Sequence, residues 1–117
     1  MIEQALVCLA TTMFMEARGE GLVGQVAVGY VLYRRADFKP ERVCDEMKKP
    51  YQFSWYGKLK PPEPNSKYLQ PFYPIAYQIL NFKAKDYSKG ATNFHNISLP
   101  NQWNMKPRAI INNHIFY

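Results

Sequence analysis

Residues 14–21, with the sequence FMEARGEG, form the most unusual local string in the chain, because Glu16 follows an apolar helical pattern and precedes a glycine turn. A carboxyl group in such half-buried surroundings has its ionised form disfavoured, so its pKa rises and it can hold a proton near neutral pH. Such a group can protonate the leaving oxygen of a glycosidic bond. The spacing alone favours the alternative that Glu16 and Glu20 are ordinary exposed residues at a helix end, which pair with Arg18 or another basic residue.

Further polar and aromatic residues could line a cleft around this carboxylate. Aromatic faces pack on sugar rings, and polar groups bind hydroxyls and acetamides. Gln25 lies on an apolar helix, where its amide either orients Glu16 or is satisfied by loop backbone. The candidates for substrate binding are Gln25, Phe53, Ser54, Asn93, His95, Trp103 and His114, with Trp55 and Tyr56 as further walls of the groove.

Alternation predicts a strand around His95. Asn93 and His95 would share one face as a polar cleft lining, with Phe94 pointing to the core on the other. His114 is expected to repeat this arrangement against Phe116. Any single aromatic among the candidates could equally be an ordinary core residue.

These residues need elements to position them, and apolar spacing predicts helices over 2–15 and 22–36, the second buried nearly all round. Pro40 suits the first turn of a short third helix that runs to about Lys49. The proline-rich segment 51–65 is predicted to be a long loop that borders the cleft. Residues 66–82 look helical again, with Pro71 and Pro74 delaying the regular part.

After Gly90 the sequence becomes rich in β-forming residues, which predicts a small antiparallel sheet near the C-terminus. We therefore expect a mainly helical α+β fold, with residues 1–117 as a single catalytic domain.

Composition sets broad limits. A hydrophobic share of 47% indicates a globular chain, and the net charge of +6 favours an acidic partner such as nucleic acid, an anionic membrane or a bacterial wall polymer. The basic residues are scattered, so a solvated basic surface explains them equally well. Cys8 and Cys44 lie in apolar helical stretches, which predicts buried reduced thiols and not a disulfide.

Several ordered blocks resemble one known family. They are EARGE at 16–20, GQVAV at 24–28, QFS at 52–54, GATNFHN at 90–96, Trp103, and HIFY at 114–117. Together they resemble the SleB/CwlJ-type cell-wall hydrolases, the spore-cortex-lytic group, and they span nearly the whole chain. The resemblance implies a lysozyme or lytic-transglycosylase-like fold with Glu16 as the catalytic residue.

It also implies cleavage of the β-1,4 bond between N-acetylmuramic acid and N-acetylglucosamine, often as a lytic transglycosylase. A transglycosylase uses the 6-hydroxyl of the muramic acid as its nucleophile, so one general acid/base suffices and no cofactor or metal is expected. Glu20 is expected to be structural, as a capping carboxylate for the following helix. Asp86 is expected to be a turn residue, and subsites in the segment 58–73 stay unassigned.

The expected partners are peptidoglycan and anionic wall polymers, held by a salt-sensitive attraction, with no specific nucleic acid and the protein as a monomer. The first fifteen residues carry Glu3 and no basic region, so they read as a core helix and neither as a signal peptide nor as a membrane span. We expect synthesis in the cytoplasm and action on the wall, as in a phage lysis or virion-borne protein.

Two other functions remain open. A zinc-dependent wall amidase or peptidase would use His95, His114 and a cysteine or carboxylate, although no compact ligand spacing is present. A nucleic-acid-binding module would use basic and aromatic residues that alternate between Lys58 and Tyr73.

Overall fold

The computed structural model describes residues 2–50 and 52–117, and in these it contains four helices and a three-stranded sheet. The helices are α1 (Ile2–Ala17), α2 (Gly21–Arg35), α3 (Pro40–Lys48) and α4 (Phe72–Leu80). The strands are β1 (Phe94–Asn96), β2 (Ala109–Ile111) and β3 (His114–Phe116). The mainly helical fold with a small C-terminal sheet is as predicted, and α1 ends one residue after Glu16.

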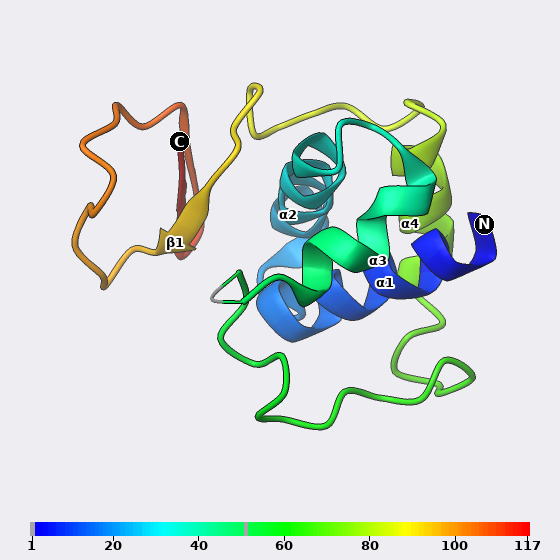
Figure 1. Ribbon diagram of the computed structural model, residues 1–117. Helices are drawn as coiled ribbons and strands as arrows, with labels where there is room; N and C mark the ends of the chain where they lie inside the picture. Colours follow the sequence, from blue (N-terminus) through cyan, green and yellow to red (C-terminus); the bar gives the residue numbers. More distant parts are fainter. Residues whose placement is uncertain (1, 51) are drawn as a thin grey trace.

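The helical body is built around α1, which packs against the other three helices (Figure 1). Its apolar positions form the main core together with the buried face of α2. Gly29 allows α2 to approach its neighbours closely, since a Cβ atom there would lie 2.5 Å from Ile79 Cδ1 and 3.1 Å from Met13 Sδ. The C-terminal end of α1 lies at one side of this body (Figure 1).

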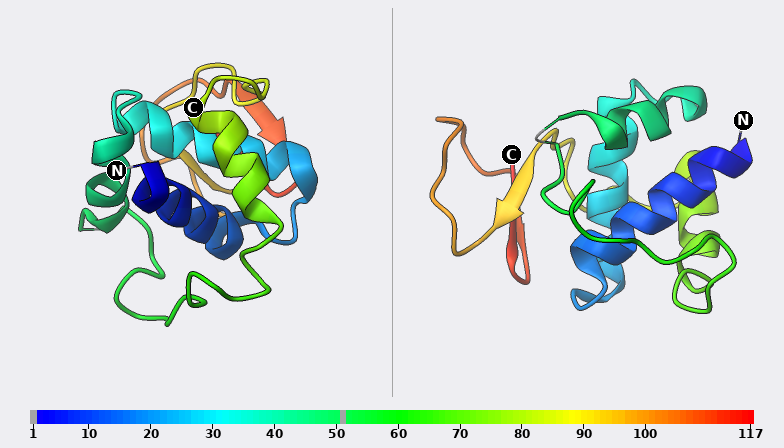
Figure 2. Two further views of the ribbon diagram at one scale, coloured as in Figure 1. Left: turned by 90° about the vertical axis from the view of Figure 1, so that its right-hand side faces the viewer. Right: turned by 60° about the horizontal axis from the view of Figure 1, so that its bottom comes forward.

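The sheet lies on that side, as the second view in Figure 2 shows. Its strand order is β1-β3-β2, and both pairings are antiparallel. The tight turn between β2 and β3 places Asn112 at φ 50°, a left-handed conformation that asparagine tolerates better than most residues. A second buried cluster, which includes Val28, Val31 and Phe116, packs the sheet against α2.

Two long loops connect these parts. The segment between α3 and α4 has no helix or strand in its described residues, which confirms the predicted loop over 52–65, and position 51 of that prediction lies outside the described residues. The segment 81–93 leads from α4 across to the sheet and runs along the top of Figure 1.

Arg34 fixes this second loop to α2. Its Nη1 donates to the carbonyl oxygen of Ala91 at 2.7 Å, and its Nη2 forms an ion pair with Asp86. Asp86 is the turn residue that was expected, since it also accepts hydrogen bonds from the backbone N–H of Ser88 at 2.9 Å and of Gly90 at 3.2 Å. Burial alone would raise the pKa of Asp86, but the hydrogen bonds from Ser88 and Arg34 outweigh it and hold the pKa below its ordinary value.

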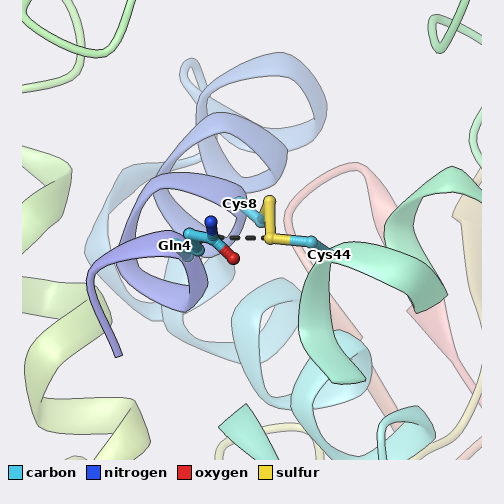
Figure 3. Close-up of a disulfide and its surroundings, with 3 residues drawn as sticks. All are labelled: Gln4, Cys8 and Cys44. Atoms are coloured by element: carbon cyan, nitrogen blue, oxygen red, sulfur yellow. Dashed lines mark hydrogen bonds between the residues drawn. A yellow bond between two sulfur atoms is a disulfide. The ribbon is translucent and has the colours of Figure 1, made fainter. Parts of the chain in front are cut away.

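Cys8 and Cys44 form a disulfide between α1 and α3, so the prediction of reduced thiols is wrong (Figure 3). Their Cα atoms are 5.4 Å apart, within the range that a disulfide requires. The crossing of the two helices creates this proximity across 36 positions of sequence. Cys44 Sγ also lies 3.2 Å from the backbone carbonyl oxygen of Gln4.

Among the described helices, none has both the length and the apolar character needed to cross a membrane.

Replacing both Cys8 and Cys44 with alanine should lower the free energy of unfolding by about 3 to 4 kcal/mol, because the disulfide restricts the unfolded chain. Guanidinium unfolding under oxidising conditions measures the difference. A reductant should bring the unmodified protein close to the variant. Equal stability under oxidising conditions, with two free thiols by titration, would contradict the disulfide.

Asp86→Asn should cost about 1 to 3 kcal/mol near neutral pH, because it weakens charge-assisted hydrogen bonds in the turn. The pKa of Asp86 is lowered by folding, so its contribution is present above the unfolded pKa and disappears as the pH falls through the folded one. The control is Asp37→Asn, which breaks an exposed ion pair with Arg42 and should change stability by less than about 1 kcal/mol. Thermal unfolding at neutral and at acidic pH measures the difference in stability. A difference for Asp86→Asn that persists in acid would contradict the stabilising role of the ionised carboxylate.

Candidate active site

Glu16 lies in the last turn of α1 and lines a cavity of about 720 Å³ between the helical body and the sheet. The other walls come from the end of α2, the loop after α3, β1 and its following loop, and His114 of β3. Among the described residues that line the cavity, Glu16 is the one carboxylate. The site therefore offers a single acidic group to a bound ligand.

Burial raises the pKa of the Glu16 carboxyl above its ordinary value. The neighbouring Trp55 indole acts in the opposite direction but offsets only part of this shift. Glu16 is half-buried at the end of the apolar stretch of α1, which agrees with the position expected from the sequence. A carboxyl group in this setting keeps its proton to higher pH than an exposed glutamate does.

Phe53 and Trp55 form the wall that faces α1. Both side chains are buried, and their rings stack with centroids 5.9 Å apart. Phe53 also contacts Phe94 of β1, with ring centroids 6.4 Å apart, so the loop is packed onto the sheet. Ser54 lies between the two aromatics and is exposed at the cavity.

His95 is held by two hydrogen bonds within a group of aromatic rings. Its Nδ1 lies 2.7 Å from the carbonyl oxygen of Asn96, and its Nε2 lies 2.9 Å from the Tyr117 hydroxyl. Because a carbonyl oxygen only accepts, Nδ1 carries the proton, and in the neutral ring Nε2 accepts from Tyr117. The Trp103 ring packs against His95 with centroids 5.2 Å apart, so a fixed aromatic surface lines the cavity.

His114 is also buried at the cavity, and burial lowers its pKa although the nearby Glu20 carboxylate opposes this. His114 Nδ1 lies 3.3 Å from Glu20 Oε1, without the geometry of a hydrogen bond. His114 and Phe116 are two residues apart in β3 and share a face, so the expected alternation between them is wrong. Phe94, which was expected to point to the core, packs against the core and also lines the cavity.

Glu20 itself binds the turn between β2 and β3. Its Oε1 accepts from the backbone N–H of Asn113 at 2.9 Å, and its Oε2 from the Asn113 side chain at 3.2 Å. It occupies the N-cap position of α2, but its side chain makes no capping hydrogen bond. Its structural role is therefore to hold the hairpin, and the predicted capping role is wrong.

Arg35 was not singled out by its sequence, yet it organises one side of the cavity. Its Nη1 donates to Asn93 Oδ1 at 2.9 Å and to the carbonyl oxygen of Thr92 at 3.1 Å. Its Nε donates to Glu46 at 3.3 Å, and Glu46 also binds Lys49 and Gln52. The available signal was Glu46 itself, an acidic residue between Val43 and Met47 on the buried face of α3.

Six of the seven predicted binding residues line the cavity with Glu16, namely Phe53, Ser54, Asn93, His95, Trp103 and His114. Gln25 lies outside the group that lines it. Its amide donates to the backbone carbonyl oxygen of Arg18 at 3.4 Å, which is the loop-backbone alternative.

A zinc site finds little support in this arrangement. Both cysteines are joined to each other, and both ring nitrogens of His95 are in hydrogen bonds. Within residues 2–50 and 52–117 no three His, Cys, Asp or Glu side chains are grouped so that they could hold a metal ion.

Comparison with known proteins finds one protein family. The family model described as Cell Wall Hydrolase matches residues 19–117, which begins three residues after Glu16. The same comparisons find no matching curated protein and no matching solved structure. Since the match covers most of the chain and agrees with the resemblance to SleB/CwlJ-type enzymes, the protein belongs to the cell wall hydrolase family.

Proposed function

We propose that this cell wall hydrolase cleaves the β-1,4 bond between N-acetylmuramic acid and N-acetylglucosamine, as a lytic transglycosylase with Glu16 as general acid and base. Family membership supports peptidoglycan as the substrate. The observation that carries the rest is the position of Glu16, a carboxyl with a raised pKa in a cavity lined by no second carboxylate among the described residues.

In the first step, protonated Glu16 gives its proton to the glycosidic oxygen while the bond from that oxygen to C1 of the muramic acid breaks. The leaving sugar departs as an alcohol, and Glu16 becomes a carboxylate. In the second step, the 6-hydroxyl of the same muramic acid attacks C1, and its proton passes to Glu16. The product is a 1,6-anhydro sugar, and Glu16 is again protonated.

This route suits a site with one carboxylate. Hydrolysis by the common retaining and inverting routes needs a second carboxylate, either as nucleophile or as the base for water. An intramolecular nucleophile removes that need, because the substrate supplies the attacking oxygen. Ser54, Asn93, His95, Trp103 and His114 are proposed to bind the sugars, as the polar and aromatic groups of the same cavity.

The charge of the protein supports attraction to an anionic wall. The chain carries a net charge of +6, and Arg18 is exposed at the mouth of the cavity. Attraction between exposed charges weakens with salt. Binding to purified walls is therefore proposed to be tighter at low ionic strength.

Glu16→Gln should reduce the release of fragments from purified peptidoglycan by about 100-fold to 10,000-fold, because the general acid and base is lost. Glu20→Gln should retain more activity, since Glu20 holds the hairpin and lies outside the group of residues that lines the cavity. Mass spectrometry of the products should show 1,6-anhydromuramic ends. Reducing muramic ends would indicate a hydrolase, freed stem peptides an amidase, and an active Glu16→Gln protein would remove Glu16 from the mechanism.

Glu16→Gln should also be more stable than the unmodified protein near neutral pH. Folding raises the pKa of Glu16, so its favourable contribution is present below the unfolded pKa and is lost as the pH rises through the folded one. Glutamine has no charge to desolvate. Thermal unfolding should show a difference near neutral pH that vanishes below about pH 4, and a variant less stable at neutral pH would contradict the burial of the carboxyl.

A further inference from the structure

Trp55 has a buried hydrogen-bond donor that no partner satisfies. Its side chain is 4% exposed, and its Nε1 makes no hydrogen bond with the described part of the chain. An unpaired buried donor costs stability, so native proteins keep few of them, and those often belong to functional sites. Trp55 lines the same cavity as Glu16.

The position of this indole is fixed by the main core, of which Trp55 is a part, and by its aromatic neighbours. Its ring stacks on Phe53, and Phe53 packs in turn against Phe94 of β1. Tyr56 also packs against the indole in an edge-on arrangement, with ring centroids 6.0 Å apart. The sheet and the loop therefore hold the N–H group in place, although the group has no partner of its own.

Glu16 is the carboxylate that lines the same cavity as Trp55, and it is the group whose pKa the Trp55 side chain affects. The Trp55 N–H opposes the rise in the Glu16 pKa but falls short of the geometry of a formed hydrogen bond, which describes a donor beside the carboxyl and not yet engaged. The other charged or titratable groups in the cavity walls are Arg18 at the end of α1, Arg35 of α2, His95 of β1 and His114 of β3. Arg35 and His95 already have hydrogen-bond partners within the protein.

We propose that Trp55 is a positioning residue whose indole N–H donates a hydrogen bond to the Glu16 carboxylate once Glu16 has given up its proton. This inference rests on the proposed function. The bond would hold the carboxylate in a fixed orientation while it accepts the proton of the 6-hydroxyl. It would also favour the ionised form, which makes Glu16 a stronger acid in the first step.

Nitrogen-15 NMR of the full chain tests the contact without any measurement of activity. The chain has two tryptophans, so Trp103→Phe assigns the indole signals. The Trp55 indole proton should shift as Glu16 ionises, and Glu16→Gln should abolish that shift. A Trp55 signal that does not titrate would overturn the proposal, and so would a titration that persists in Glu16→Gln, because it would then come from His95, His114 or another group.

Kinetics of Trp55→Phe test the role, since phenylalanine keeps an aromatic ring and removes the donor. We expect kcat to fall by about 10-fold or more with little change in KM, and the alkaline limb of the pH profile to move to higher pH. A raised KM with an unchanged alkaline limb of the pH profile would mean that the indole N–H binds the substrate, and this would overturn the proposal. A lowered Tm with an unchanged alkaline limb would indicate a merely structural role and would overturn it as well. Tyr77→Phe, on the exposed side of α4, is the control for loss of a polar aromatic group and should behave as the unmodified protein.

Activity in the Glu16→Gln protein would contradict the proposed function, and it would also contradict the role of Trp55 in catalysis. The indole titration would still report whether Trp55 and Glu16 are in contact. The two failures are therefore distinguishable.

Discussion

The candidate site depends on how the last turn of α2 is attached to the sheet. Arg34 binds the loop before β1 through Asp86 and Ala91, and Arg35 binds Asn93 and Thr92 while it pairs with the buried Glu46. Two adjacent side chains on one helix thus hold successive parts of the same crossing segment. Since the sheet carries His95 and His114 to the cavity, these contacts help to place both histidines in the same cavity as Glu16.

Arg34 and Arg35 use their positive charges for contacts within the protein. Each guanidinium group is partly buried and spreads its donors over a carboxylate and backbone carbonyl oxygens. Arginine suits this task because its donors lie in a rigid planar fork. The net positive charge of the chain therefore overstates how much of it is available on the surface for an anionic polymer.

Much of the fold could be predicted because local patterns of apolar residues, prolines and β-forming residues determine it. Apolar spacing marked α1 and α2, prolines marked the start of α3 and the long loop, and β-forming residues marked the sheet. The cleft residues were found because they lie in the blocks that resemble the cell-wall hydrolases, and because their polar and aromatic character suits a sugar-binding groove. The Cys8–Cys44 bond and the partners of Arg35 were missed, because each joins residues that are distant in sequence and only tertiary packing brings them together. The side-chain directions in β3 were predicted wrongly, because His114 and Phe116 are two residues apart and such residues share one face of any strand.

The bond between Cys8 and Cys44 makes the rigidity of the helical body depend on its redox surroundings. Glutathione and thioredoxin keep such pairs reduced in the cytosol, whereas the periplasm and the cell surface favour the oxidised form. α1 carries both one half of this bond and Glu16, so the helix that presents the acid is also the helix that oxidation ties down. A protein built in this way gains stability when it leaves a reducing compartment, on the side of the membrane where peptidoglycan is found.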